Sequence, residues 1–279
     1  MLDIRLIALD LDGTLLNSDK KLSEKNRNAL ERAAAEGIEI VPATGRFYRG
    51  MPQVIRDLPF VHYVISINGA QVYDVREDKS IFVSEIDCDT AIKVMEQLDK
   101  ADLIYDCYQN GWGWMTQAFY DKAQDYAAST HSLEMIRNLR SPVSELKAYL
   151  KEKNAGVQKV QAFFKDIEER AEFFTLIQKE FPDLKITTSM VNNIEINSNE
   201  ANKGNALKNL ADYLGFPLSK TMAFGDDLND ISMIETAGIG VAMGNADDFV
   251  KKIADFESCD CDNDGIAFAL EKLLWEKDI

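Results

Sequence analysis

Cysteine, histidine and long hydrophobic runs are all scarce in this chain of 279 residues. The four cysteines show no disulfide framework, and the pair Cys259 and Cys261 lacks the second pair that a zinc site would need. Reduced cysteines suit a cytoplasmic protein. Only two histidines are present and no serine stands in a nucleophile-elbow motif, so a Ser-His-Asp mechanism has little support.

Basic residues are also fewer than acidic ones. The 31 lysines and arginines against 47 acidic residues give a formal net charge of −16, which argues against nucleic acid or an anionic membrane surface as a partner. No apolar stretch approaches the length of a membrane span, and the run after Arg5 is too short for a signal peptide. The overall charge would repel a phosphorylated substrate, so the site for one has to be locally cationic.

The segment from Leu6 to Leu16 is the first motif with chemical content. Leu6 to Asp10 is a short apolar run that ends in a carboxylate, which is typical of a strand buried on both faces of a parallel sheet. Asp12 follows, and Gly13 permits a sharp bend. Two acids at the open end of a buried strand are costly unless a cation lies there. A plain strand with an Asp-Gly turn fits these residues equally well.

A second acid cluster decides between these alternatives. Thr221 to Phe224 is another short apolar run, and it leads through Gly225 into Asp226, Asp227, Asn229 and Asp230. Parallel sheets bind ligands at the carboxyl ends of their strands, so the two clusters are expected to converge. An acidic helix N-terminus is the alternative, but these polar groups exceed what capping requires. Converging carboxylates predict a site for a hard cation such as Mg²⁺.

Two further short motifs lie between the acid clusters: Ala43 to Arg46, and Asn202 to Gly204. In this order the four segments resemble the four motifs of the haloacid dehalogenase-like hydrolases, in the Cof-type branch of sugar-phosphate phosphatases. The pattern spans nearly the whole chain. The first and fourth motifs are specific, whereas the second and third would be weak alone.

The predicted fold is α/β, with a Rossmann-like parallel-sheet core, helices on both of its faces and an inserted α+β cap domain. A helix capped by Ser23 and ended by Gly37, followed by a strand from Ile38 to Ala43, indicates a crossover unit of the parallel sheet. We assign residues 1–84 and 192–279 to the core. A helix is expected from Asn245 to Ile253.

Residues 85–191 are predicted to form the inserted cap, because they are too long for a loop and alternate helical with strand patterns. The expected helices are Thr90 to Leu98, Phe119 to Ala127, Val143 to Leu150 and Ile167 to Lys179. By resemblance, the cap covers the site and sets substrate specificity. Trp112 and Trp114 offer an aromatic face to a ligand, although packing within a strand is the simpler interpretation.

The resemblance also implies roles for the acids. Asp10 is the nucleophile that becomes an aspartyl phosphate, and Asp12 is the general acid and base. Mg²⁺ is expected to bind Asp10, the backbone carbonyl of Asp12, and Asp226, with Asp227 as a further ligand or next to one. Asp230 is expected to orient Lys203 through an ion pair.

Phosphate and substrate contacts are expected from the second and third motifs. Thr44, Gly45 and Lys203 would hold phosphoryl oxygens, assisted by Asn229. Arg46 fits either a surface arginine or a fork for phosphate or hydroxyl groups. Asn68 begins an Asn-Gly turn, for which substrate contact is the alternative to a purely structural role.

The expected function is Mg²⁺-dependent hydrolysis of small phosphomonoesters, such as sugar phosphates, by a cytoplasmic monomer or small homo-oligomer. A phosphomutase of the same fold, or a non-catalytic metabolite- or metal-binding module, are the alternatives. Asp260 to Gly265 with Glu271 match the spacing of an EF-hand calcium loop. The preceding residues read as a short strand rather than the entering helix that an EF-hand needs, so no calcium site is expected.

Overall fold

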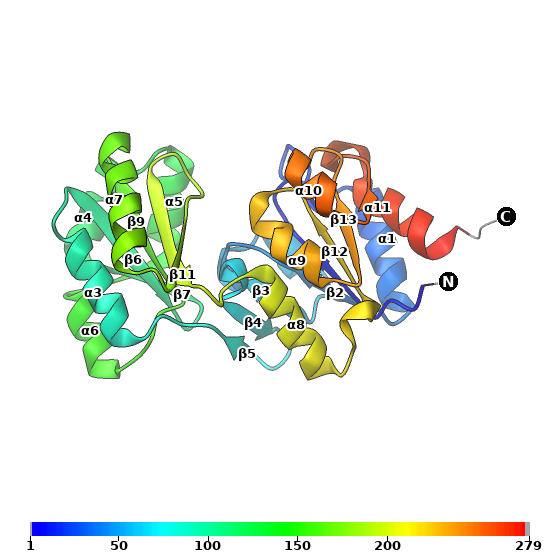
Figure 1. Cartoon of the computed structure of the whole chain (residues 1–279), viewed down its shortest axis with the longest axis horizontal. Helices are drawn as coiled ribbons and strands as arrows, with labels where there is room; N and C mark the ends of the chain where they lie inside the picture. Colours follow the sequence, from blue (N-terminus) through cyan, green and yellow to red (C-terminus); the bar gives the residue numbers. More distant parts are fainter. Residues whose placement is uncertain (1, 277–279) are drawn as a thin grey trace. The chain divides into compact units, whose positions relative to one another are not determined.

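The computed structural model describes residues 2–276 and divides the chain into two compact units (Figure 1). The core unit comprises the residues up to Phe82 and those from Asn202 on, and the inserted unit runs from Val83 to Ala201. The predicted second boundary, between residues 191 and 192, is ten residues too early. The reason is β11 (Asn193–Ser198), which pairs antiparallel with β9 (Lys159–Phe164) of the inserted unit.

The core unit is built on a five-stranded parallel sheet in the order β14-β13-β12-β1-β2. Its strands are β1 (Leu6–Leu9), β2 (Glu39–Pro42), β12 (Thr221–Gly225), β13 (Ile239–Ala242) and β14 (Phe256–Glu257). Leu9 is level with Phe224 on one side and with Pro42 on the other. The residues that follow these three strands therefore emerge together at one edge of the sheet.

Helices cover both faces of this sheet, as predicted. Successive side chains of β1 point to opposite faces of the sheet, so Ile7 and Leu9 pack into one apolar cluster and Leu6 and Ala8 pack into another. The first cluster packs α1 (Glu24–Ala35), α10 (Asp248–Ile253) and α11 (Gly265–Leu270), and the second packs α8 (Lys203–Leu214) and α9 (Ile231–Thr236). Ser23 caps α1 by accepting from the Asn26 N–H, as the sequence indicated. The core is thus a three-layer α/β/α unit (Figure 1).

A smaller three-stranded sheet follows β2. It contains β3 (Tyr63–Ser66), β4 (Gln71–Asp74) and β5 (Lys79–Val83), with β3 and β4 antiparallel. Between β3 and β4 the turn η2 (Ile67–Gly69) holds three successive residues at positive φ, of 53°, 54° and 93°. Such a conformation is strained for the β-branched Ile67. Short helical turns complete the unit: α2 (Gln53–Arg56), η1 (Tyr48–Gly50), η3 (Leu218–Lys220), η4 (Leu228–Asp230), η5 (Cys261–Asn263) and η6 (Glu271–Trp275).

The inserted unit has a six-stranded sheet in the order β10-β11-β9-β6-β7-β8. Besides β9 and β11, its strands are β6 (Leu103–Gln109), β7 (Trp112–Thr116), β8 (Arg140–Val143) and β10 (Leu184–Thr187). One face packs against α3 (Cys88–Leu98), α6 (Leu146–Lys153) and α7 (Ile167–Glu180). The other face packs in part against α4 (Gln117–Tyr126) and α5 (Thr130–Leu139).

Two predictions about local structure are wrong. Residues 140–143 form β8, a strand that was not expected, and the next helix begins at Leu146 rather than Val143 because Val143 ends β8. In the core, α10 begins at Asp248 rather than Asn245. The reason is the cap: the side chain of Asp247 accepts from the Phe249 N–H, so the helix starts at the residue that follows Asp247.

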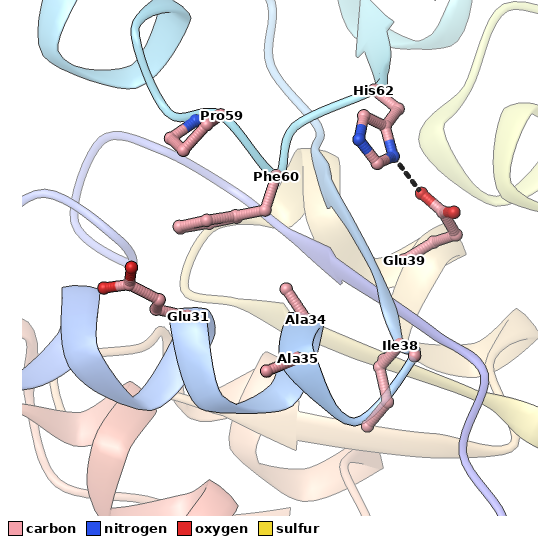
Figure 2. Close-up of a pocket in the computed structure, with 9 residues that line it drawn as sticks. Glu31, Ala34, Ala35, Ile38, Glu39, Pro59, Phe60 and His62 are labelled. Atoms are coloured by element: carbon pink, nitrogen blue, oxygen red, sulfur yellow. Dashed lines mark hydrogen bonds and ion pairs between the residues drawn. The ribbon is translucent and has the colours of Figure 1, made fainter.

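The core unit also carries an open hollow of about 370 Å³ between α1 and the segment that enters β3 (Figure 2). Phe60 lies over Ala34 and Ala35, and His62 Nδ1 is 3.0 Å from Glu39 Oε2. Glu39 is the first residue of β2, so this hollow lies at the opposite end of the parallel sheet from Asp10. Within residues 2–276, no helix combines the length and the hydrophobicity needed to cross a membrane.

Candidate active site

Three carboxylates gather where β1 and β12 end. Asp10 follows β1 directly and its N–H donates to the Phe224 carbonyl at 3.0 Å. Asp226 follows β12, and Asp230 ends η4. One oxygen from each of these three side chains lies within 4.8 Å of the others. Residues that are separated by most of the chain thus meet at one edge of the sheet, as expected.

Lys203 lies within this carboxylate group. Its Nζ is 2.5 Å from Asp10 Oδ1 and 2.6 Å from Asp230 Oδ1, and its side chain is fully buried. Lys203 is the first residue of α8, whose N-terminus is capped by Asn202. A cation at the positive end of a helix is locally unfavourable, and the two carboxylates compensate for it.

Asp230 holds both this lysine and the acidic loop. Its Oδ2 accepts from the N–H groups of Asp226 and Asp227, at 3.0 and 3.1 Å, while Oδ1 accepts from Lys203. Gly225 makes room for it, because a Cβ there would lie 2.4 Å from the Asp230 Cβ. Asp230 is therefore committed to positioning other groups.

Asp226 is held by two residues that sequence reasoning did not single out. Thr14 Oγ1 donates to its Oδ1 at 2.7 Å, and Asn245 Nδ2 lies 3.3 Å from its Oδ2 and donates to the Gly13 carbonyl at 2.8 Å. Gly13 has φ +92° and passes so close that a Cβ would lie 2.3 Å from Asp226 Oδ2. Thr14 stands in the first motif. Asn245 follows the end of β13, the same signal that identified the acids.

Asp12 is paired with two cations. Arg46 donates to both carboxylate oxygens at 3.1 to 3.3 Å, and Lys20 Nζ lies 3.1 Å from Oδ1. Burial opposes its charge, but Arg46 and Lys20 outweigh that effect and lower the pKa of Asp12. Lys20 gave no signal in the sequence, because it belongs to a loop with no recognisable motif.

The second motif and its neighbours form one connected group. Thr44 is buried, its Oγ1 accepts from the Arg46 N–H at 3.2 Å, and its carbonyl accepts from the Asn68 N–H at 3.0 Å. Gly45 lies against Asn68, whose Oδ1 also accepts from Asn229 Nδ2 at 3.3 Å. The structure therefore places the expected phosphate and substrate contacts next to one another.

The electrostatics of the carboxylate group favour a cation. Burial, opposed by Lys203 and reinforced by Asp230, raises the pKa of Asp10 to about 7, and burial raises that of Asp226 to about 6. Burial disfavours the ammonium, but Asp10 and Asp230 together raise the pKa of Lys203. Three acids against one lysine leave negative charge that a divalent cation would neutralise, and carboxylate oxygens are the ligands such a cation prefers.

Asp227 is not part of this group. Its side chain is exposed and accepts from the Leu228 N–H at 2.7 Å, which caps η4. The two tryptophans of β7 contact other residues of the inserted unit. Trp114 stacks on Tyr149 with ring centroids 4.8 Å apart, and Trp112 Nε1 donates to Ser141 Oγ at 2.9 Å.

The acids with calcium-loop spacing have other partners. Asp262 accepts from Ser18, Asp264 pairs with Lys25, and the loop follows β14 rather than a helix. The entering segment is therefore the short strand that the sequence indicated.

Comparisons with known proteins agree with this geometry. A family model described as haloacid dehalogenase-like hydrolase matches residues 7–270. The Bacillus subtilis phosphatase YwpJ is 34% identical over 97% of this chain and all of that protein, and the B. subtilis 5-amino-6-(5-phospho-D-ribitylamino)uracil phosphatase YcsE is 32% identical over 96% and 95%. The crystal structure of a haloacid dehalogenase-like hydrolase from Bacteroides thetaiotaomicron superposes with a TM-score of 0.82, at 25% identity over 97% of this chain and all of that one.

Proposed function

Since the chain belongs to the haloacid dehalogenase-like hydrolase family and is a phosphatase, we propose that it hydrolyses small phosphomonoesters with Mg²⁺ through an aspartyl-phosphate intermediate. The observation that carries this proposal is the group formed by buried Asp10, Lys203 and Asp230 with half-buried Asp226 at one edge of the parallel sheet.

Asp10 is the nucleophile in this proposal. One of its carboxylate oxygens attacks phosphorus, and the bond between phosphorus and the ester oxygen breaks. A carboxylate about 4 Å from a phosphate charge is opposed by about 4 kcal/mol per charge pair at an effective dielectric near 20. The ammonium of Lys203, 2.5 Å from Asp10, offsets part of that repulsion. Mg²⁺, held by Asp10, the Asp12 carbonyl and Asp226, would neutralise phosphoryl charge.

Asp12 is the general acid and base in this proposal. It donates a proton to the departing alkoxide and then accepts one from the water that hydrolyses the aspartyl phosphate, which releases inorganic phosphate. The ion pairs with Arg46 and Lys20 hold Asp12 as a carboxylate, the form that the second step requires. The first step requires Asp12 to leave these ion pairs and take up a proton.

Phosphate binding falls to the groups around Asp10. Thr44, Gly45 and Lys203 hold the phosphoryl oxygens, with Asn229 beside them, and Arg46 and Asn68 border the substrate. Asp230 orients Lys203. To bind the cation, the Asp227 side chain would have to release the Leu228 N–H from which it accepts.

The inserted unit, by this proposal, is the cap that contacts the organic part of a sugar phosphate or similar metabolite. The relative YcsE is named for a substrate that carries a phosphoribityl chain, which supports a hydroxylated leaving group. The protein acts in the cytoplasm as a monomer or small homo-oligomer.

Phosphate release from a panel of phosphomonoesters tests the proposal. Activity should vanish in excess chelator and return when Mg²⁺ is added in excess of it. Full activity in excess chelator would rule out the metal role. Transfer of the phosphoryl group to a sugar, with release of inorganic phosphate only in trace amounts, would indicate a phosphomutase instead.

A further inference from the structure

The loop of residues 17–21 follows the first motif and folds back onto the second acid of that motif. Lys20 Nζ lies 3.1 Å from Asp12 Oδ1, although more than half of the Lys20 side chain is exposed. Lys20 also has a φ of +60°, a left-handed backbone conformation that residues other than glycine, asparagine and aspartate seldom adopt. A solvated surface lysine does not need this conformation. Backbone strain of this kind is instead typical of a residue whose position is used.

Hydrogen bonds to Asn17 close this loop. The Asn17 carbonyl accepts from the Lys20 N–H at 2.8 Å. Asn17 Oδ1 accepts from the Lys21 N–H at 2.8 Å, and the Asn17 N–H donates to the Lys21 carbonyl at 3.0 Å. These bonds hold Lys20 in its left-handed conformation and fix the backbone from which its side chain extends to Asp12.

Asp262 anchors the loop from the far end of the chain. The N–H and the Oγ of Ser18 both donate to Asp262 Oδ1, each at 2.9 Å. Two bonds from one residue to one carboxylate oxygen restrain that residue more than a single surface contact does. The loop is therefore tied at Ser18, two residues before Lys20.

The segment that carries Asp262 is itself bonded to the active site. Asp262 belongs to η5, and the N–H of the preceding Cys261 donates to Asn245 Oδ1 at 2.9 Å. Asn245 Nδ2 in turn donates to the Gly13 carbonyl at 2.8 Å. Thus η5 contacts the first motif through Asn245 and the following loop through Ser18. One of the acids with calcium-loop spacing lies where it can support the active site.

We propose that Asp262 is a positioning residue for the hydrolysis of the aspartyl phosphate. Through its bonds to Ser18 it holds the loop of residues 17–21 in place. The loop in turn holds Lys20 beside Asp12, so that the Asp12 carboxylate lies in one position when water attacks. The inference rests on the proposed function and adds to it a residue that acts from outside the active site.

The second chemical step is the one that depends on this positioning. In the proposed function Asp12 leaves its ion pairs to protonate the departing alkoxide, and it returns to them before water attacks. Water then attacks phosphorus, one of its protons passes to Asp12, and the bond between phosphorus and the Asp10 oxygen breaks. Arg46 borders the substrate in this proposal, whereas the Lys20 ammonium pairs with Asp12 from the loop. Loss of Lys20 should therefore slow hydrolysis and leave the formation of the aspartyl phosphate unchanged.

The test follows single turnovers of 4-nitrophenyl phosphate by the full chain with Mg²⁺, with enzyme in excess. Absorbance records the release of 4-nitrophenol, and a fluorescent phosphate sensor records the release of inorganic phosphate. The mean delay between the two products is the lifetime of the aspartyl phosphate. Asp262→Ala and Lys20→Met should each lengthen this delay about tenfold and leave the rate of 4-nitrophenol release unchanged. A substitution that only loosened the fold would slow 4-nitrophenol release instead.

A double-mutant cycle shows whether Asp262 acts through Lys20. Asp262→Ala combined with Lys20→Met should lengthen the delay no further than Lys20→Met alone, because the contact with Asp12 is already lost. Asp262→Asn keeps an oxygen that accepts from Ser18 and should restore a delay close to that of the wild type. Multiplicative effects in the double variant would overturn the inference.

Matched controls come from the same loop. The side chains of Asp19 and Lys21 pair with each other at the surface, 3.5 Å apart. Asp19→Ala and Lys21→Met repeat the two substitutions one residue away from Lys20 and should leave the delay unchanged. A delay in Asp262→Ala that equals the delay in Asp19→Ala would also overturn the inference.

Failure of the proposed function is recognisable separately. If the wild type releases neither 4-nitrophenol nor phosphate from this ester or from the wider panel of phosphomonoesters, the proposed function is wrong and the inference falls with it. If the wild type releases both products and the variants at Asp262 and Lys20 keep the wild-type delay, only the inference is wrong.

Discussion

The two units each bury a charged group, and the two groups differ in balance. In the core, Asp10, Asp226 and Asp230 surround one ammonium, that of Lys203. In the inserted unit, two buried ion pairs, Arg140 with Asp106 and Lys159 with Glu195, balance two acids with two bases. An unbalanced group attracts an ion of the missing sign, whereas a balanced group with unsatisfied atoms attracts a neutral hydrogen-bonding partner. Charge balance thus distinguishes a group that could hold a cation from a group that is already neutral.

Asp10→Asn should give the largest effect. The amide keeps the shape of the side chain and loses the nucleophile, so turnover of ribitol 5-phosphate should fall at least about a thousandfold while the protein remains folded. Asp106→Asn in the balanced group should leave most of kcat, because Asp106 belongs to the inserted unit and not to the carboxylate group of the core. Steady-state kinetics and circular dichroism check both variants. Near wild-type rates for Asp10→Asn would mean that another residue is the nucleophile.

Replacing the buried lysine of each group should give two variants whose melting temperatures respond differently to Mg²⁺. Lys203→Met removes the cation that pairs with Asp10 and Asp230, and Lys159→Met removes the cation that pairs with Glu195. Each change should destabilise the protein by about 3–5 kcal/mol. Added Mg²⁺ should raise the melting temperature of Lys203→Met more than that of Lys159→Met, because the proposed Mg²⁺ site lies among the core carboxylates. Thermal unfolding with and without Mg²⁺ measures this. An equal response would contradict the assignment of the metal to the core.

The pH dependence of stability should come largely from the unbalanced group. The folded pKa values of Asp10 and Asp226, about 7 and about 6, lie above the ordinary 3.8, so the folded state binds more protons than the unfolded chain between these values. Their contribution is therefore full below pH 4 and is lost as the pH rises through 6 and 7. Melting temperatures in chelator from pH 4.5 to 8 check this prediction. Asp10→Asn should reduce the change of melting temperature with pH. An unchanged pH dependence in this variant would show that the raised pKa of Asp10 is not its cause.

Asn245→Ala should give the smallest of these effects. Loss of the contacts to Asp226 and to the Gly13 carbonyl should weaken Mg²⁺ binding about tenfold without unfolding the protein. Calorimetry with Mg²⁺ measures the affinity. Asn263→Ala is the control, because Asn263 donates only to Asp260 at the surface. A similar loss in the control would show that the effect is not specific to Asp226.

The core site was largely predictable because its residues directly follow apolar strands. Asp10 and Asp226 each come after a buried run of β-strand character, and strand ends in a parallel sheet meet at one edge. Register with β1 then brings the Thr44 loop to the same edge. The family resemblance added Lys203, which helix spacing alone did not distinguish from a solvated lysine.

The remaining features depend on tertiary packing. Lys20 reaches the site from a loop, and nothing in its neighbouring residues shows it. Asn245 follows the end of β13, a signal that was present in the sequence but was not used. The two buried ion pairs of the inserted unit were missed for a different reason. Arg140 stands at the start of β8, a strand that the pattern did not predict, and the partners of Arg140 depend on sheet register.

The pairing of β1 with β12 has a consequence for biosynthesis. More than two hundred residues must leave the ribosome after Asp10 before its partners Asp226 and Asp230 exist. The inserted unit is continuous from Val83 to Ala201, so its own strands are all available while the first strand of the core still waits for its neighbour. A nascent chain that stops short of β12 consequently holds the complete inserted unit but lacks Asp226 and Asp230.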